Sequence, residues 1–177
     1  LNAHKQRGLP QVIASTVEEA NFHPQSIDAM GMFDVIEHID GDRAFLEKMA
    51  PLIKMGGRLY LTVPCHGWLW SRADVDAGHY RRHTAQSLRV WLEGLFEIDY
   101  LSYFFGPLVL PQFLLRALPF RLGLGRKAGL SAEAEHGAKN GQIVSLLNKL
   151  LAREAIKIRS GEQLRFGASC LLAAHRI

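Results

Sequence analysis

The stretch "FDVIEHIDGDRAFLEKMAPLIKMGGRLYLTVP", Phe33 to Pro64, decides the fold that this sequence predicts. It begins where an apolar run ends, then places an aspartate and a Glu-His pair, Glu37 and His38. A helical pattern comes next, followed by two glycines and a second apolar run, Arg58–Pro64. Strand, helix and strand joined by short connections are typical of a parallel sheet with crossover helices. The apolar runs lack strict alternation, which predicts strands covered on both faces.

The helix inside this stretch has its own start and stop signals. Asp40 or Asp42 can cap its beginning. Three apolar residues recur on one face at helical spacing: Leu46, Met49 and Ile53. Pro51 is expected to weaken the last turn, because proline lacks a backbone N–H. Gly56 and Gly57 are then expected to end the helix and turn the chain.

Further elements flank this stretch on both sides. Apolar runs predict four more strands or strand ends: Gln11–Ser15, Ser26–Phe33, Phe96–Tyr100 and Ala168–Ile177. Thr84 can cap a helix whose apolar stripe is Leu88, Trp91, Leu92 and Leu95, and residues 142–158 form a second amphipathic helix. The segment Cys65–His83 has no clear period and is predicted to be a long loop, of a length that is usually functional or disordered. Residues 123–141 are rich in glycine and are predicted to be flexible.

Length and composition restrict the class of protein. The chain of 177 residues is long enough for a single domain, 1–177, and its net charge of +4 comes without a dense run of Lys or Arg. We therefore expect no nucleic-acid partner. The longest uncharged run, Tyr100–Leu115, falls short of the roughly 20 residues that span a bilayer, so no transmembrane helix is expected.

The cysteines and the first residues of the chain indicate the cellular compartment that we expect. Cys65 and Cys170 share no metal-ligand spacing, which favours a reduced, cytoplasmic protein, although the sequence leaves a disulfide open. The polar opening "LNAHKQRG" is unlike a signal peptide. The first residue is not Met, so the natural start is expected to lie upstream.

The ordered series of motifs resembles the C-terminal two-thirds of a class I S-adenosylmethionine-dependent methyltransferase. The carrying residues are the Phe33–Pro64 stretch, "GHYRRHT" at 78–84 and "LRFGASCLLAAHR" at 164–176, and the last two are similar to the small-molecule branch of these enzymes. The resemblance implies an α/β, Rossmann-like, mainly parallel sheet with an antiparallel last strand and with its N-terminal part missing. It also implies S-adenosylmethionine as cofactor, S-adenosylhomocysteine as product, and in-line methyl transfer to an oxygen, nitrogen or carbon of a small molecule.

The chain departs from the family pattern at two places. The glycine-rich first loop and the acidic residue that holds the ribose are absent, so the chain is either a fragment or preceded by a segment not shown. The aspartate that commonly meets the adenine is matched by Thr16, followed by Val17. A threonine hydroxyl can accept the same hydrogen bond without the charge.

The resemblance places the cofactor against one set of residues: Thr16, Val17, Phe33, Asp34, Val35 and His38. Ligands in open α/β sheets bind outside the carboxyl ends of strands, which favours this role for Asp34 over that of a simple strand cap. His38 and His79 are the candidate catalytic bases. The alternative for His38 is to close the cofactor pocket and hold a neighbouring loop, since alignment alone drives many methyl transfers.

The loop Cys65–His83 carries the candidate substrate-binding residues: Trp68, Trp70, His79, Tyr80, Arg81 and Arg82. Adjacent arginines suit a carboxylate or phosphate. The alternative is that one arginine pairs with Asp74 or Asp76 and pins the loop. The tryptophans can cover an apolar substrate or anchor the loop on the core.

A metal ion is not expected in this loop. His79 and His83 are four residues apart, and further potential ligands lie nearby: Asp74, Asp76, Cys65 and His66. Histidine and carboxylate are common metal ligands, but no tight ligand motif appears among them.

Residues from about 104 to 142 are predicted to form an insert, or lid, on the substrate side. The part "FFGPLVLPQFLLRALPFRLGLGRK" joins large apolar residues to basic ones. A helical lid or a homodimer contact is favoured over insertion into a membrane interface. Two other functions stay open: a non-catalytic, methyltransferase-like binding module that serves as a partner subunit, and a peripheral membrane protein that acts on a lipid or quinone.

Overall fold

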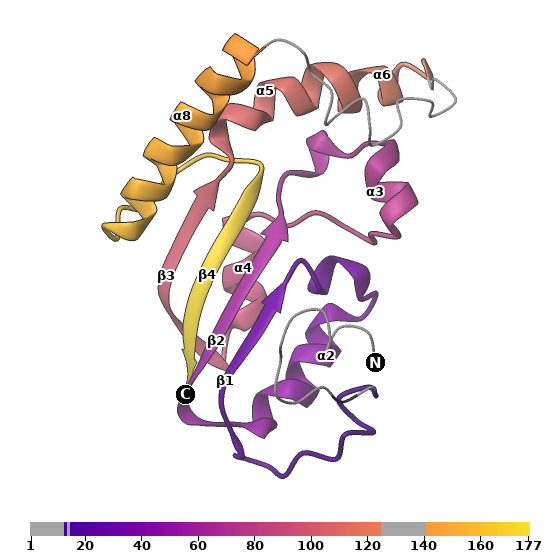
Figure 1. Ribbon diagram of the computed structural model, residues 1–177. Coiled ribbons are helices and arrows are strands. Elements are labelled where there is room, and N and C mark those ends of the chain that lie inside the picture. Colours follow the sequence, from indigo (N-terminus) through magenta and orange to yellow (C-terminus); the bar gives the residue numbers. More distant parts are fainter. Residues whose placement is uncertain (1–12, 14, 125–140) are drawn as a thin grey trace.

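The computed structural model describes residues 13, 15–124 and 141–177, which form a four-stranded mixed sheet with helices on one face and at one edge (Figure 1). The strands are β1 (Ile27–Phe33), β2 (Ile53–Pro64), β3 (Phe96–Phe104) and β4 (Ser169–Arg176), in the order β1-β2-β4-β3. β1 pairs with β2 in parallel, and β4 runs antiparallel between β2 and β3. The predicted mainly parallel α/β sheet with an antiparallel last strand is confirmed.

β1, β2 and β3 therefore end at the same edge of the sheet, which we call the carboxyl edge. β4 begins there, because Ser169 pairs with both Pro64 and Phe104. This edge lies at the top of Figure 1, where the arrowheads of β1, β2 and β3 point.

The core lies between the sheet and two helices, α2 (Asp42–Met49) and α4 (Ala85–Leu92). The core contains apolar residues from the predicted helical stripes and strands. Fully buried members are Leu46, Leu59, Leu61, Leu88, Leu92 and Leu172. The opposite face of the sheet is more open within the described residues, since Tyr60 is 41% exposed and Phe33 is 61% exposed. β2 buries Leu59, Leu61 and Val63 in alternation, so the prediction of strands covered on both faces is not met by the described part of the chain.

The helix α2 ends earlier, and β2 begins earlier, than the sequence predicted. A 3-10 turn, η2 (Ala50–Leu52), contains Pro51, and Ile53 already pairs with Ile27 of β1. Ile53 is therefore a strand residue and not part of the helical stripe. Gly56, at φ +72°, lies inside β2, where the register with β1 shifts, so the two glycines form an irregularity of the strand rather than a helix stop.

The segment Cys65–His83 is more ordered than a long loop. It contains the 3-10 turn η3 (Gly67–Leu69) and the helix α3 (Arg72–Ala77). Ser71 and Asp74 form a reciprocal cap at the start of α3, and Gly78 ends it in the left-handed conformation. The sequence signal was present, but six residues are too short for an apolar period to show.

The remaining predicted elements fare differently. Thr84 caps α4 through a hydrogen bond from Ser87, as expected, and β3 extends to Phe104, beyond the predicted Tyr100. The predicted strand Gln11–Ser15 lies mostly outside the described residues, and Ile13 and Ser15 are not in a strand. The glycine-rich region predicted to be flexible also lies mostly outside them, at 125–140. Cys65 and Cys170 are both buried and unbridged.

Helical segments lie beyond the carboxyl edge (Figure 1); those up to residue 124 belong to the region predicted as a lid, a role that stays a prediction, and the last one is the predicted helix 142–158. They are η4 (Gly106–Leu108), α5 (Val109–Gln112), the π-helical η5 (Phe113–Ala117), α6 (Leu118–Arg121) and α8 (Gly141–Arg159). The carboxylate of Glu154 on α8 accepts hydrogen bonds from the backbone N–H groups of Phe105, at 2.7 Å, and Gly106, at 3.0 Å. Among the described helices, none combines the length and the apolarity that a membrane crossing requires.

Candidate functional site

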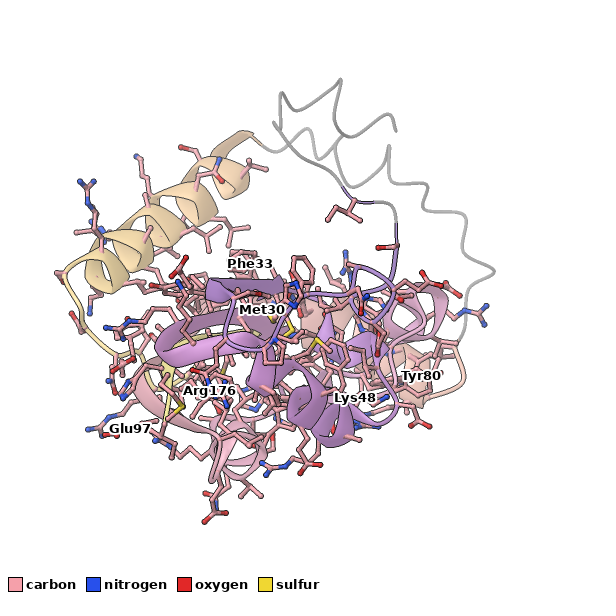
Figure 2. The ribbon with its side chains drawn as sticks, turned by 90° about the horizontal axis from the view of Figure 1, so that it is seen from below. Met30, Phe33, Lys48, Tyr80, Glu97 and Arg176 are labelled. Atoms are coloured by element: carbon pink, nitrogen blue, oxygen red, sulfur yellow. The ribbon has the colours of Figure 1, made fainter. Side chains whose placement is uncertain are left out.

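The chain leaves β1 through a left-handed residue, Asp34, whose φ is +52°. Its N–H donates to the carbonyl of Thr62 on β2 at 3.0 Å, and the hydroxyl of Thr62 donates to Oδ1 of Asp34 at 3.1 Å. This turn holds Phe33 and Val35 outward, 61% and 39% exposed. Figure 2 shows Phe33 on the side of β1 away from Lys48 of α2. Non-glycine residues adopt this conformation at a cost, which is typical of functional turns.

A cluster of Glu37, His38 and His79 lies directly beyond this turn. Glu37 and His38 belong to the 3-10 turn η1 (Ile36–His38), and the Glu37 carbonyl accepts a hydrogen bond from the N–H of Tyr80 at 2.7 Å. This bond brings the loop to η1. The rings of His38 and His79 then meet edge to face, with centroids 4.7 Å apart. Two candidate bases that are 41 positions apart in sequence are thus neighbours.

Glu37 itself is buried, with an exposed fraction of 1%. Its Oε2 has no hydrogen-bond partner among the described residues. Burial raises the pKa of Glu37, and nearby Asp34 adds to the rise, while its own backbone N–H and the two histidines oppose it. An unpaired buried carboxyl group is costly unless a proton or a cation satisfies it.

Asp74 orients the ring of His79 through a contact with Nδ1. Nδ1 of His79 lies 3.0 Å from Oδ1 of Asp74, which is 1% exposed. Arg82 donates to both carboxylate oxygens, at 2.7 and 3.1 Å, and the backbone N–H of Ser71 donates at 2.9 Å. Burial alone would raise the pKa of Asp74, but the hydrogen bonds from Arg82 and His79 outweigh it and hold that pKa below its usual value.

The two adjacent arginines of the loop, Arg81 and Arg82, both have protein partners. The guanidinium of Arg82 donates hydrogen bonds to both carboxylate oxygens of Asp74 and to the carbonyl of Cys65. This arrangement matches the alternative in which an arginine pairs with Asp74 and pins the loop. Arg81 lies 2.6 Å from a carboxylate oxygen of Asp42 and also donates to Asp40. Tyr80 between these contacts is 57% exposed (Figure 2).

An aromatic cluster at the carboxyl edge surrounds His66, a residue in the left-handed region at φ +64°. Its ring stacks on Tyr103 at 5.2 Å and on Trp68 at 5.5 Å, and it lies 5.7 Å from Phe166. Trp68 also meets Phe113 of the lid edge to face and is 38% exposed, whereas Trp70 is half-buried. Trp68 is therefore an anchor between loop and lid that keeps one open side.

The structure places Thr16 and Val17 apart from these residues. The hydroxyl of Thr16 accepts from the N–H of Glu19 at 3.2 Å. Val17 lines a cavity of about 170 Å³ whose other walls include Lys48 and Met49 of α2 and Leu52. These residues precede β2, so the cavity lies toward the start of that strand and not at the carboxyl edge. The assignment of Thr16 and Val17 to the cofactor stays a prediction.

Three contributors were absent from the predicted site residues. Glu37 was noted only as part of the Glu-His pair, and its burial is a tertiary property. Asp74 was weighed as a partner for an arginine, and the structure shows that it serves His79 as well. His66 carries no local signal that would separate it from other loop histidines.

The comparisons with known proteins concern the fold. No family model and no curated protein matches the sequence. A phosphoethanolamine N-methyltransferase 2 of Haemonchus contortus, solved with S-adenosyl-L-methionine, is 16% identical over 88% of this chain, at a TM-score of 0.43. A SAM-dependent methyltransferase of Archaeoglobus fulgidus is 15% identical over 93% of this chain, at 0.49. The [4+2]-cyclase SpnF is 17% identical over 98%, also at 0.49.

The chain spans only part of these proteins: 34%, 66% and 60% of their respective lengths. A fold does not by itself determine the chemistry that a protein performs. The chemistry of this protein has to be argued from its own residues.

Proposed function

We propose that the protein transfers a methyl group from S-adenosylmethionine to an oxygen, nitrogen or carbon nucleophile of a small molecule. One observation carries the proposal. The motif series that resembles methyltransferases folds so that the left-handed Asp34 and the Glu37–His38–His79 cluster meet at the carboxyl end of β1. Ligands of open α/β sheets bind outside such strand ends.

The residues around Asp34 fit the cofactor in their chemistry. Phe33 and Val35 offer exposed apolar surface, and Asp34 offers an exposed carboxylate that can accept hydrogen bonds. We place the cofactor against Phe33, Asp34, Val35 and His38. Bound there, S-adenosylmethionine supplies a methyl group attached to a positively charged sulfur.

The segment Cys65–His83 supplies the contacts that we propose for the methyl acceptor. We infer that the acceptor enters between the histidine pair and the aromatic cluster, with Trp68, Trp70 and Tyr80 as apolar contacts and Arg81 at its border. The nucleophile attacks in line, forming its bond to the methyl carbon as the carbon–sulfur bond breaks. We assign to His38 or His79 the proton that a hydroxyl or amine acceptor loses. The protein's main contribution is alignment.

Calorimetric titration of the full-length protein with S-adenosylhomocysteine tests the proposal. Methyltransferases hold this product in the cofactor site, so we expect saturable binding in the micromolar range. A folded full-length protein that does not bind it contradicts methyl transfer. That outcome is what the non-catalytic binding module predicts, so the same titration distinguishes the two.

The acceptor side needs its own assay. Transfer of a labelled methyl group to a panel of hydroxyl, amine and carbon-acid acceptors, followed by the His38→Gln and His79→Gln variants, reports on the two histidines. We expect at least one variant to lower turnover by about tenfold or more while S-adenosylhomocysteine still binds. Unchanged turnover in both would remove the histidines from the chemistry. Acceptors of the lipid or quinone class belong in the panel, because the lid exposes Leu110, Leu114 and Leu115.

A further inference from the structure

We propose that Glu37, His38 and His79 form a binding site for a divalent transition-metal ion such as Zn²⁺. Each residue can direct one ligand atom to a shared point, because a carboxylate oxygen and two ring nitrogens lie within 4.8 Å of one another. Ligand atoms about 2.1 Å from an ion stand on the order of 3 to 4 Å apart, so small side-chain rotations would complete the site. The inference does not depend on methyl transfer; with an ion bound, the two histidines serve as ligands and not as bases.

The buried carboxylate is the first argument for an ion. Glu37 is 1% exposed, and its Oε2 has no hydrogen-bond partner among the described residues. A buried acidic side chain normally pairs or coordinates a metal, because desolvation of an uncompensated charge is expensive. A ring nitrogen of His38 and one of His79 lie within 4.8 Å of its carboxylate, and a neutral imidazole is a common metal ligand.

The support behind His79 is the second argument. Its Nδ1 lies 3.0 Å from Oδ1 of the buried Asp74, so Asp74 fixes the ring with Nδ1 as the donor. The opposite nitrogen, Nε2, then carries a lone pair. A carboxylate bound to the far nitrogen of a ligating histidine is the usual outer support of metal sites, where it fixes the tautomer and the ring orientation.

Asp74 is itself held rigidly. Arg82 donates to both of its oxygens, and Ser71 donates through its backbone N–H and its hydroxyl. A carboxylate with these partners cannot follow a rotating imidazole, so the direction of His79 is set before any ion arrives. Such preorganisation distinguishes a built site from histidines that meet by chance.

The donor set indicates the class of ion. Two imidazoles and one carboxylate suit zinc, iron(II) or nickel better than magnesium or calcium, which prefer all-oxygen sites. Three protein ligands also leave open positions on the ion. An oxygen of a small molecule could occupy one of them.

The test uses the full-length protein stripped with a chelator and titrated with ZnCl₂ by calorimetry, with Co²⁺ absorption as a second readout of imidazole and carboxylate coordination. We expect one ion per chain at this site and a rise in the melting temperature. His38→Gln, His79→Gln and Glu37→Gln should each weaken binding at least tenfold, and Asp74→Asn should weaken it about 10- to 100-fold through His79.

His175→Gln is the matched control. His175 also lies beside carboxylates, 2.9 Å from Asp99 and 3.7 Å from Glu97, but at the far end of β4. Its substitution should leave the affinity unchanged. The proposal is overturned if the wild type binds no ion tighter than millimolar, or if the three ligand variants bind as the wild type does. Circular dichroism identifies a variant that fails to fold, in which case the remaining two variants decide.

Discussion

Nδ1 of His79 and Oδ1 of Asp74 lie 3.0 Å apart, and this contact links the candidate site to the interior of the loop. The same carboxylate binds Arg82 through both of its oxygens. One buried acid thus orients a site histidine and holds the segment that carries it. Substitutions around Asp74 should therefore separate folding from function, depending on which partner is removed.

Removal of Arg82 should cost much more stability than removal of a surface arginine. Arg82→Ala leaves the buried Asp74 carboxylate without its main cation, and we expect a loss of about 3 kcal/mol in the free energy of unfolding. Arg72→Ala breaks the exposed pair with Asp76, and we expect a loss below about 1 kcal/mol. Urea denaturation of both variants measures the difference. Equal losses would mean that the Asp74–Arg82 pair does not hold the loop.

Stability should fall as the pH is lowered from 7 to 5. Burial lowers the pKa of His66 and of His83; Arg82 adds to the effect at His66 and Arg81 at His83, while the Gly167 backbone and Asp42 oppose it. Below about pH 6.5 the unfolded chain therefore binds more protons than the folded chain, and folding loses free energy.

The variants His66→Gln and His83→Gln stay neutral across this range, so each should show a shallower pH dependence in urea denaturation. Asp74 affects the stability at a lower pH than the histidines do. Its pKa lies below the usual value, so its contribution is present above about pH 4 and is lost in stronger acid. The raised pKa of Glu37 acts in the opposite direction, so the comparison with the wild type decides: two variants with the same pH dependence as the wild type would rule out the assignment to buried neutral histidines.

Gly167 should tolerate no side chain. A Cβ at this position would lie 2.2 Å from the carbonyl oxygen of Phe104 and 2.7 Å from its backbone nitrogen. Gly167→Ala should therefore destabilise the protein by about 3 kcal/mol, because β3 would have to move. Gly141→Ala is the control, since a Cβ there meets nothing within 4 Å, and the change should stay below about 1 kcal/mol. Thermal denaturation of the two variants measures the difference in stability.

Asp34 should matter for the cofactor and Asp28 should not. Both lie on or next to β1, at opposite ends, and both are exposed. Asparagine tolerates the left-handed conformation of position 34, so Asp34→Asn should fold normally and yet bind S-adenosylhomocysteine about tenfold more weakly. Asp28→Asn breaks only an exposed pair with Lys54 and should bind as the wild type does. Equal affinities in the two variants would move the cofactor away from this turn.

Much of the fold could be predicted because its signals are local. Thr84 at the start of α4, the apolar residues of β1 and β4, and the stripe of α8 depend on residues within a few positions of each other. The element boundaries that were predicted wrongly also have local causes. Pro51 ended α2 early, which freed Ile53 for the strand, and the Ser71 cap formed a helix too short to show a period.

The chemical groups of the site can be identified from the sequence: an acid and an imidazole at a strand end, two arginines, and a histidine in a loop. Which of these groups meet depends on the folded chain. The hydrogen bond from Tyr80 to the Glu37 carbonyl brings His79 against His38, and the burial of Asp74 turns Arg82 from a ligand candidate into a structural ion pair. Local patterns set helices and strands through backbone geometry, whereas burial and charge pairing depend on contacts between residues far apart in the chain.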